Sequence, residues 1–218
     1  QSDGVTLTGY GSFYITDNFY MDTRISYGKP NFDQSRRINF SMNETTIDRV
    51  AVGETSANQY TAAMSMGYHF NKKAWNITPN ASIRYVNTSI DAFKESGAGG
   101  FNFEYAQQDI TSMTASVGVS LSRAISLEKG IITPQFDINM SREMENDGGM
   151  IEARFINAPD DEIFWIQTDE PDRTFGNAGL GLVFIGANGK QAYINYRSIF
   201  GLDGFSRGTI NIGLRFEF

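Results

Sequence analysis

The chain offers few residues that could carry catalysis or bind a metal. His69 is the one histidine among 218 residues, and cysteine is absent. General-base and metal-binding histidines act with partner residues, and no second histidine is present to support His69. We therefore expect no catalytic residues, no cofactor and no enzymatic activity.

An acidic segment covers residues 143–172. Its start, Glu143-x-Glu145-x-Asp147-Gly148, is similar to a calcium-binding loop, but Arg154 stands where such a loop needs its bidentate glutamate. Either the segment is a solvated exterior loop, or it holds a divalent cation that bridges to lipid headgroups. The first reading is favoured, and we expect no metal site. Its ten acidic residues are Glu143, Glu145, Asp147, Glu152, Asp160, Asp161, Glu162, Asp169, Glu170 and Asp172.

Composition excludes two classes of protein. The chain has 18 basic and 25 acidic residues, a formal charge of −7, whereas nucleic-acid binding needs a basic surface. No apolar run approaches the ~18 residues of a membrane-spanning helix. A membrane β-barrel stays possible, because alternation halves its apparent hydrophobicity. Gln1 opens without the features of a signal peptide, so we expect either a removed signal or a start partway through a longer protein.

The C-terminal stretch, residues 208–218, alternates strictly. Successive side chains of a strand point to opposite faces, so this strand has one apolar and one polar face. In a soluble sandwich the apolar face would meet a second sheet, and in a membrane barrel it would meet lipid. The apolar face consists of Ile210, Ile212, Leu214, Phe216 and Phe218.

The same alternation recurs along the chain and predicts nine strands in a single domain, 1–218. A strand-like 38–40 and a short ribbon at 152–156 and 162–168 lie within loops. Aromatic residues beside the short turns, Phe70, Trp75 and Phe184, fit an interfacial girdle. The expected strands lie at residues 5–16, 21–27, 60–70, 75–85, 113–122, 132–141, 177–184, 192–197 and 208–218.

Connection lengths favour a barrel over a sandwich. The short connections are 17–18, 71–73, 126–129 and 187–190; the others are 29–57, 87–109, 142–173 and 202–207. The two sets alternate along the chain. A membrane barrel has tight turns at one end and long loops at the other, whereas a sandwich scatters loop lengths. The sequence therefore predicts an all-β fold, an antiparallel up-and-down transmembrane β-barrel.

Several phrases, in order, carry a family resemblance. They are Gly-Tyr-Gly-Ser-Phe-Tyr at 9–14, Phe-Tyr-Met-Asp at 19–22, Met-Gly-Tyr-His-Phe at 66–70, Ile-Thr-Pro-Asn-Ala-Ser-Ile-Arg-Tyr at 77–85, Asp-Ala-Phe-Lys-Glu-Ser-Gly-Ala at 91–98, Ser-Val-Gly-Val-Ser-Leu at 116–121, Ile-Thr-Pro at 132–134, Gly-Leu-Gly-Leu at 179–182 and Gly-Leu-Arg-Phe-Glu-Phe at the end. From Leu7 onward the chain resembles the translocator domain of type V autotransporters.

This resemblance implies a bacterial outer-membrane anchor and translocator that exports or displays an N-terminal passenger. It also implies extracellular long loops, a periplasmic C-terminus, and lipid, lipopolysaccharide, the barrel-assembly machinery and the passenger as partners. The family barrel has about twelve strands and a helix in its lumen. With nine strands seen here, the first three, the helix and the self-cleavage asparagine are expected upstream, so no cleavage residue is carried over.

Two sets of residues become candidate functional sites. The terminal apolar face resembles the family's assembly signal, and strand addition at an edge suits its capture; it also fits a plain closing strand. Charges on a lipid face are costly, so the charged residues are expected to face the lumen. They either hydrate the lumen and pair across strands, or form a wall that a passenger slides past. They are Asp22, Arg24, Arg84, Asp137, Arg197, Arg215 and Glu217.

Two other functions stay open: a self-contained small porin or adhesin-like barrel, and an outer-membrane protease or lipase, which the single histidine disfavours. Nine strands should not close by themselves, because single-chain bacterial barrels have even strand numbers and an open edge in lipid is costly. We therefore expect either a partner strand upstream of residues 5–16 or an additional membrane crossing near 38–40.

Overall fold

The computed structural model describes residues 2–42, 45–145, 149–159, 162–168, 172–186 and 189–216. These residues form antiparallel strands with one short 3-10 turn, η1 (Gly99–Phe101), which confirms the all-β prediction. No helix in these ranges is long and apolar enough to cross a membrane.

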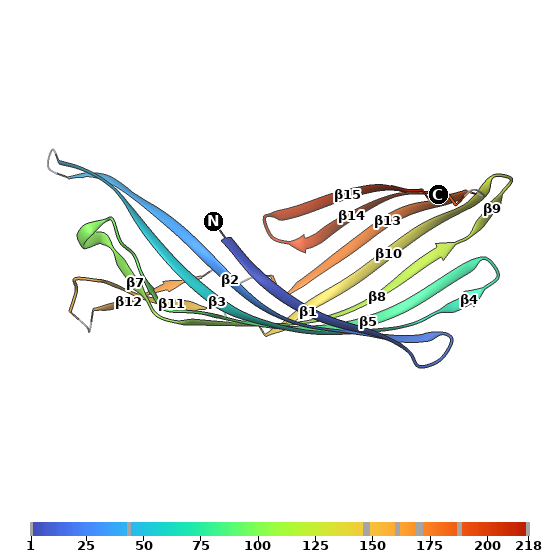
Figure 1. Ribbon diagram of the computed structural model, residues 1–218, viewed down its shortest axis with the longest axis horizontal. Helices are drawn as coiled ribbons and strands as arrows, with labels where there is room; N and C mark the ends of the chain where they lie inside the picture. The colour runs from blue at the N-terminus through green and yellow to red at the C-terminus, as the bar shows by residue number, and fades with distance from the viewer. Residues whose placement is uncertain are drawn as a thin grey trace.

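Nine strands follow one another in a single curled sheet, which we call the wall (Figure 1). Each pairs with the next along the path, so the up-and-down order is confirmed. Two short strands, β4 (Phe70–Lys72) and β9 (Ile125–Leu127), pair with β5 and β10 beside the short turns. The nine are β1 (Ser2–Tyr14), β2 (Phe19–Met42), β3 (Thr45–Tyr68), β5 (Trp75–Ile90), β8 (Gln108–Arg123), β10 (Gly130–Glu145), β13 (Thr174–Gly186), β14 (Gln191–Leu202) and β15 (Phe205–Arg215).

β1 and β15 stand at the two ends of this order, and within the described residues they do not pair with each other. The sheet is therefore a curled half-barrel, as expected for nine strands that do not close (Figure 1). The predicted upstream partner of β1 stays a prediction.

The longest predicted loop is instead a hairpin. β2 and β3 pair without a break in register from Phe19↔Tyr68 to Met42↔Thr45. Residues 29–57 are therefore the far half of two 24-residue strands. Residues 38–40 belong to this half of β2, so the proposed additional crossing is wrong. The segment was misassigned because its polar side chains suit a solvated hairpin as well as a loop.

A second sheet has the order β12 (Ile163–Gln167), β11 (Met150–Phe155), β7 (Phe103–Tyr105) and β6 (Phe93–Lys94). The β11–β12 pair confirms the short ribbon predicted within 142–173. A backbone bridge between Val52 and Ser96 joins this sheet to the side of β3. We call residues 29–57 and 93–105 together with β11 and β12 the distal extension, and from here on the wall means the nine strands without residues 29–57; the extension occupies the left of Figure 1.

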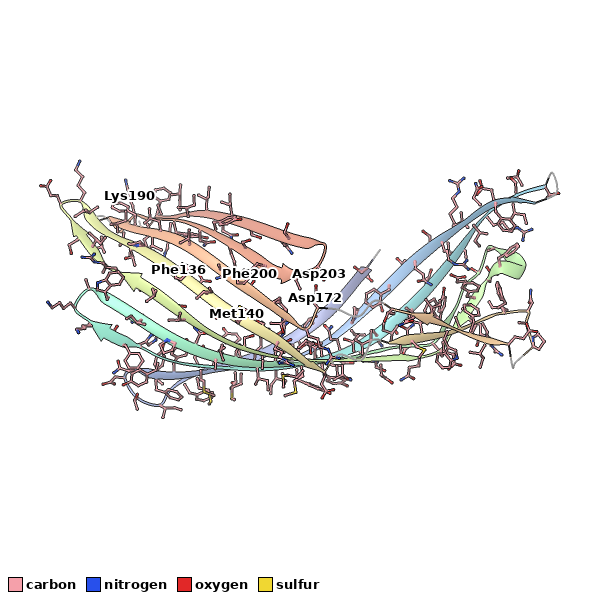
Figure 2. The ribbon with its side chains drawn as sticks, turned by 180° about the vertical axis from the view of Figure 1, so that it is seen from behind. Phe136, Met140, Asp172, Lys190, Phe200 and Asp203 are labelled. Carbon is pink, nitrogen blue, oxygen red and sulfur yellow. The ribbon has the colours of Figure 1, made fainter. Side chains whose placement is uncertain are left out.

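Two other connections differ from expectation. β14 and β15 meet in a two-residue turn at Asp203 and Gly204, whose φ of 68° suits glycine, so residues 202–207 are not a long loop. β10 runs on to Glu145, beyond the predicted start of the acidic loop. In Figure 2, Lys190 marks the short-turn end of the wall, and Asp172 and Asp203 lie together away from that end. There Asp203 N donates to Asp172 Oδ2 at 2.5 Å.

Candidate functional site: the concave polar face

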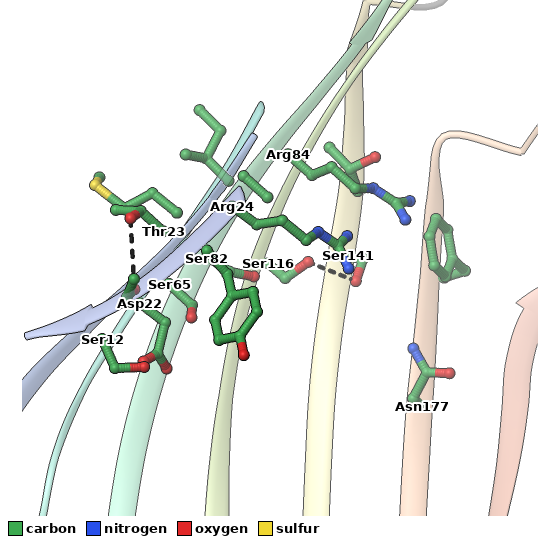
Figure 3. Close-up of a pocket in the computed structure, with 17 residues that line it drawn as sticks. Ser12, Asp22, Thr23, Arg24, Ser65, Ser82, Arg84, Ser116, Ser141 and Asn177 are labelled. Carbon is green, nitrogen blue, oxygen red and sulfur yellow. Dashed lines mark hydrogen bonds between the residues drawn. The ribbon is translucent and has the colours of Figure 1, made fainter. Parts of the chain in front are cut away.

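The register gives the wall two chemically different faces. Arg24 pairs with Ala63, Ala63 with Arg84, and Arg84 with Thr114, so one set of positions lies on the concave face of four successive strands. The neighbouring positions point outward from the convex face. A groove of about 510 Å³ runs along the concave face (Figure 3). Its polar lining is Tyr10, Ser12, Asp22, Thr23, Arg24, Ser65, Ser82, Arg84, Thr114, Ser116, Ser141 and Asn177.

Three of the expected lumen charges lie in this groove. Asp22, Arg24 and Arg84 project from β2 and β5 among short hydroxyl side chains (Figure 3). Ser116 and Ser141 hydrogen-bond across β8 and β10 at 2.8 Å between their Oγ atoms. The groove therefore presents charges and hydroxyls to whatever lies on this side of the sheet.

A second pair of expected charges meets across an intervening strand. Arg197 Nη2 lies 3.6 Å from Asp137 Oδ1, with β13 between their strands. The position between them is Gly179, and a Cβ there would collide with Asp137 Oδ1. Within the described residues, Asp137 Oδ2 is buried and accepts no hydrogen bond. Because Gly179 has no side chain, Asp137 and Arg197 can approach each other across β13.

The last two expected charges belong to the final strand. Arg215 is in register with Gln191 of β14. Both residues lie on the same face of the sheet as Arg197, which is in register with Thr209. Asn211 Nδ2 donates to Asn195 Oδ1 at 3.0 Å on this face. Glu217 lies outside the described residues, as does Phe218.

Glu143 also belongs to the concave face, which sequence reasoning missed by assigning it to a calcium-like loop. Its carboxylate accepts hydrogen bonds from Ser112 Oγ at 2.8 Å, Met113 N at 2.6 Å and Thr114 Oγ1 at 3.0 Å. The alternation of β10 through residue 143 is the signal that could have placed it. Asp147, Asp160, Asp161, Asp169 and Glu170 of the acidic segment lie outside the described residues, and within the described part no acidic or histidine cluster could hold a metal ion.

The convex face of the wall is apolar and exposed. Ile210, Ile212 and Leu214 of the expected assembly signal are 65%, 71% and 69% exposed, and Phe216 is 53% exposed. Val5, Leu7, Val117 and Leu180 continue this surface over other strands. A soluble protein rarely leaves so broad an apolar face uncovered.

Aromatic side chains frame the convex face at two levels. Tyr68, Phe70 and Trp75 stand beside one short turn, with the Tyr68 and Phe70 rings 4.6 Å apart. Tyr27 and Tyr60 pack against each other across β2 and β3, with their rings tilted by 41° and their centroids 5.0 Å apart. Tyr60 and Tyr68 are eight residues apart on β3. At ~3.3 Å per residue this is about 26 Å along the strand, or about 20 Å of height at a strand tilt of ~40°, compared with the ~25 Å apolar band of membrane barrels.

His69 is engaged structurally beside the first short turn. Its Nδ1 lies 2.9 Å from Thr78 Oγ1, and its ring stacks on Tyr20 with centroids 5.0 Å apart. Its backbone N–H donates to the Asn18 carbonyl at 2.8 Å. These contacts bind the two neighbouring short-turn connections to each other.

A curled antiparallel sheet with an apolar convex face and a polar concave face defines the wall of a transmembrane β-barrel. A family model described as the autotransporter beta-domain matches residues 1–197, so the chain belongs to this family. It is accordingly an integral outer-membrane β-barrel of a type V secretion system, and its family is defined by translocation rather than by an enzymatic reaction.

Named relatives agree with this assignment. The Outer membrane protein A of Rickettsia conorii (strain ATCC VR-613 / Malish 7) and that of Rickettsia rickettsii are each 24% identical over 148 residues. That match covers 66% of this chain but 7% of each relative, so the chain corresponds to a small part of their length.

Two solved structures share the fold. The translocator domain of autotransporter NalP from Neisseria meningitidis superposes with a TM-score of 0.64 at 18% identity, covering 100% of this chain and 66% of that one. The beta domain of the Bordetella autotransporter BrkA superposes with a TM-score of 0.54 at 16% identity, covering 98% of this chain and 70% of that one.

Proposed function

We propose that this chain anchors an N-terminal passenger in the outer membrane and exports or displays it at the cell surface. The observation that carries the proposal is the contrast between the two faces of one sheet. Ile212 and Leu214 on the convex face are 71% and 69% exposed, as lipid contact requires. The concave groove carries charges and hydroxyls, as an aqueous passage requires.

The concave face is the lumen wall in this proposal. Asp22, Arg24 and Arg84 line the groove, and the Asp137–Arg197 pair lies farther along the sheet. Arg215 and Glu217 complete the set from the final strand. Charged, hydroxyl and amide side chains outnumber the apolar ones in this lining, which also includes Phe175, so a passenger can slide along a mostly polar surface.

The membrane boundaries follow the two aromatic levels. Tyr27 and Tyr60 mark one interface, and Phe70 and Trp75 mark the other. The distal extension then lies outside the membrane at the Tyr27 level. We assign that side to the cell exterior, in contact with lipopolysaccharide, and the short turns and the C-terminus to the periplasm. Residues 1–218 act together as one barrel domain.

The final strand is the proposed assembly signal. Ile210, Ile212, Leu214 and Phe216 form an exposed apolar row on a strand that has β14 on one side and no other partner within the described residues. Phe218 extends that row in the sequence. A free edge with an aromatic anchor suits capture by strand addition, here by the barrel-assembly machinery.

The test uses the complete gene product with an epitope placed before residue 1. We expect the epitope to be cleaved by protease added to intact cells, and the protein to migrate differently on gels with and without boiling. Deleting Phe218 should slow assembly far more than it destabilises barrels already formed. A heat-modifiable barrel whose epitope never reaches the surface would instead support a self-contained porin or adhesin, and a protein soluble without detergent would refute both.

A further inference from the structure

β12 is an open edge of the second sheet. Within the described residues the order of that sheet begins with β12, and β11 is its only neighbour there. The register between the two strands runs without a break from Met150↔Gln167 to Arg154↔Ile163. β12 therefore presents a row of backbone N–H and C=O groups that no strand of the described chain uses.

Two hydrogen bonds identify the residues that face this open edge. Thr168 N donates to the carbonyl of Gly149, which is directly opposite in the register, at 3.1 Å. The Glu152 carbonyl accepts from Ala106 N at 3.1 Å, so Glu152 is bonded on the side away from β12. Opposite residues of antiparallel strands alternate between hydrogen-bonded and non-hydrogen-bonded pairs. The residues whose N–H and C=O groups point away from β11 are therefore Ile163, Trp165 and Gln167.

This edge lacks the features that usually prevent strand addition. Its five residues include no proline and no charged side chain, and the pairing with β11 has no bulge. Ile163, Trp165 and Ile166 are 43%, 58% and 37% exposed. Five residues is an ordinary strand length, so the edge can hold a segment of similar length. An exposed apolar edge of this kind indicates a binding partner.

The outer face of β12 suits a cation. Trp165 lies beside Glu152 on this face, because the two residues are in register. The nearby cations, Lys94 and Arg154, both bind Glu104, at 3.3 and 2.9 Å. A guanidinium or ammonium group from an added strand would therefore meet an aromatic ring and a carboxylate.

The inner face of the same strand is apolar. Phe164 packs there against Phe155, with ring centroids 5.8 Å apart. Ile166 is in register with Ile151, and both line a hollow of about 680 Å³ inside the curl of the distal extension. An added strand would continue this curl, so its inward side chains would lie beside Phe164, Ile166 and the hollow. Apolar side chains suit that position.

We propose that β12 binds an extended polypeptide of another molecule by antiparallel strand addition, and that this polypeptide alternates arginine or lysine with apolar residues. The basic residues lie opposite Ile163, Trp165 and Gln167, where they reach Trp165 and Glu152, and the apolar residues face the hollow. The proposal goes beyond the proposed function and rests on it only in placing the distal extension outside the membrane.

A second copy of this chain fits the edge less well. Two paired β12 strands would supply no basic residue to Glu152, because Ile163–Gln167 contains none. Such pairing would also bring in a second Glu162, which directly precedes β12 and is exposed. Charge complementarity therefore favours a basic partner over a second copy.

The complete gene product, held in nanodiscs of zwitterionic lipid, would be titrated with fluorescently labelled nine-residue peptides. The probe alternates valine and arginine, and fluorescence anisotropy measures its dissociation constant. In the proposed pairing the N–H groups of the arginines point to β12, and those of the valines point away. N-methylation of the arginines should therefore weaken binding about tenfold or more, whereas N-methylation of the valines should change it little.

The two methylated peptides have the same charge and composition, so equal affinities would overturn strand addition. A peptide that alternates valine and glutamate should bind about tenfold more weakly than the probe, or less. Equal or tighter binding of that peptide would overturn the basic partner. All of these comparisons use the unaltered protein, so none depends on whether a variant assembles.

Variants locate the binding surface on the protein. Glu152→Gln and Trp165→Ala should each weaken binding of the probe about three- to tenfold, because each removes a contact for the arginines. Glu54→Gln removes an exposed carboxylate from β3 and is the matched control, which should bind as the parent protein does. Unchanged affinity in both Glu152→Gln and Trp165→Ala would overturn the site.

Hydrogen exchange reveals any other occupant of the edge. The amide protons of Ile163, Trp165 and Gln167 should exchange freely without peptide and slow when the probe binds. Protection without peptide that grows with protein concentration would show a second copy on the edge, and protection independent of concentration would show another part of the same chain. Either result would overturn the proposal, whereas unchanged heat modification and passenger display would leave the proposed function intact.

Discussion

The wall and the distal extension are built from the same alternating strands, yet their two faces have opposite chemistry. In the wall, Thr114 and Ser116 line an open concave groove, and Val117, the residue after Ser116, is 64% exposed on the convex side. In the extension, Phe103 and Phe155 pack on the concave side, and the exposed Arg37–Asp48 pair lies on the convex side. The aromatic cluster of the extension is thus on its concave side, although Val50, Val52 and Trp165 are exposed on its convex side.

Different surroundings explain this inversion. Lipid meets the convex face of the wall, so apolar residues are favourable there and charges are costly. In the proposed membrane placement, water meets the convex face of the extension, which must therefore build its own core, as a soluble sheet does. The small buried residues Ala51, Ala98 and Ala153 all lie in the extension, whereas the buried Thr78, Thr114 and Ser141 lie in the wall. The change occurs within β2 and β3, near Tyr27 and Tyr60.

The largest expected effect on the extension comes from removing the centre of its core. Phe103→Ala should destabilise the extension by about 2–3 kcal/mol, less than for a fully buried ring, because it removes the partly buried ring between Arg36, Phe155 and Phe164. Hydrogen exchange should accelerate in β6, β7 and β11 while the wall stays protected. Trp165→Ala, at a 58% exposed position of β12, is the control and should change exchange little. Equal acceleration in the wall would mean that the two regions unfold as one.

The lipid-facing assignment is tested on β13. Leu180→Arg, at a 61% exposed convex position, should lower the free energy of unfolding in lipid vesicles by about 2–4 kcal/mol. Asn177→Arg, which places the same charge in the concave groove, should change it far less. Denaturant titration of both variants in the same lipid measures the difference. If Asn177→Arg lowered the free energy of unfolding more than Leu180→Arg, the assignment of the convex face to lipid and the concave face to the lumen would be wrong.

Two glycines on one face of β13 test how the groove accommodates its ion pair. Gly179→Ala should cost about 1–3 kcal/mol, because the new methyl group collides with Asp137 Oδ1 beside Arg197. Gly181→Ala should cost less, since the nearest atom, Gln135 Oε1, lies 3.2 Å from the new Cβ. The midpoint of thermal unfolding in detergent compares them. Equal costs would show that the ion pair does not depend on the space above Gly179.

The smallest effect concerns acid. Glu104 binds Arg154 at 2.9 Å and Lys94 at 3.3 Å on the outer side of the extension. Burial alone would raise the pKa of Glu104, but these hydrogen bonds lower it below its ordinary 4.5. The stabilisation is therefore present above about pH 4.5 and is lost as the pH falls below it. Protease protection of the extension should weaken there, and Glu104→Gln should remove this step.

Much of the wall could be predicted from alternation alone. Side chains at Arg24, Arg84 and Arg197 were assigned to one face because charges on a lipid face are costly, and the register places all three on the concave face. The nine strands and their order followed from the same pattern. Ile38 and Phe40 were expected within a loop, because the polar residues around them resemble a solvated connection. They belong instead to a strand, because they pair with residues 49 and 47 of β3.

The sequence by itself determined the two faces of the wall, since a period of two residues and the exclusion of charge from lipid are local rules. Only the tertiary structure decided the distal extension. Its core joins Arg36, Glu95 and Phe164, which come from three separate connections, and no local pattern relates them. Likewise, only the tertiary structure gave Glu143 its hydrogen-bond partners Ser112 and Thr114 on β8, although alternation along β10 could have placed it on the concave face. Contacts between distant segments arise only when the chain curls, so the folded sheet was needed to reveal them.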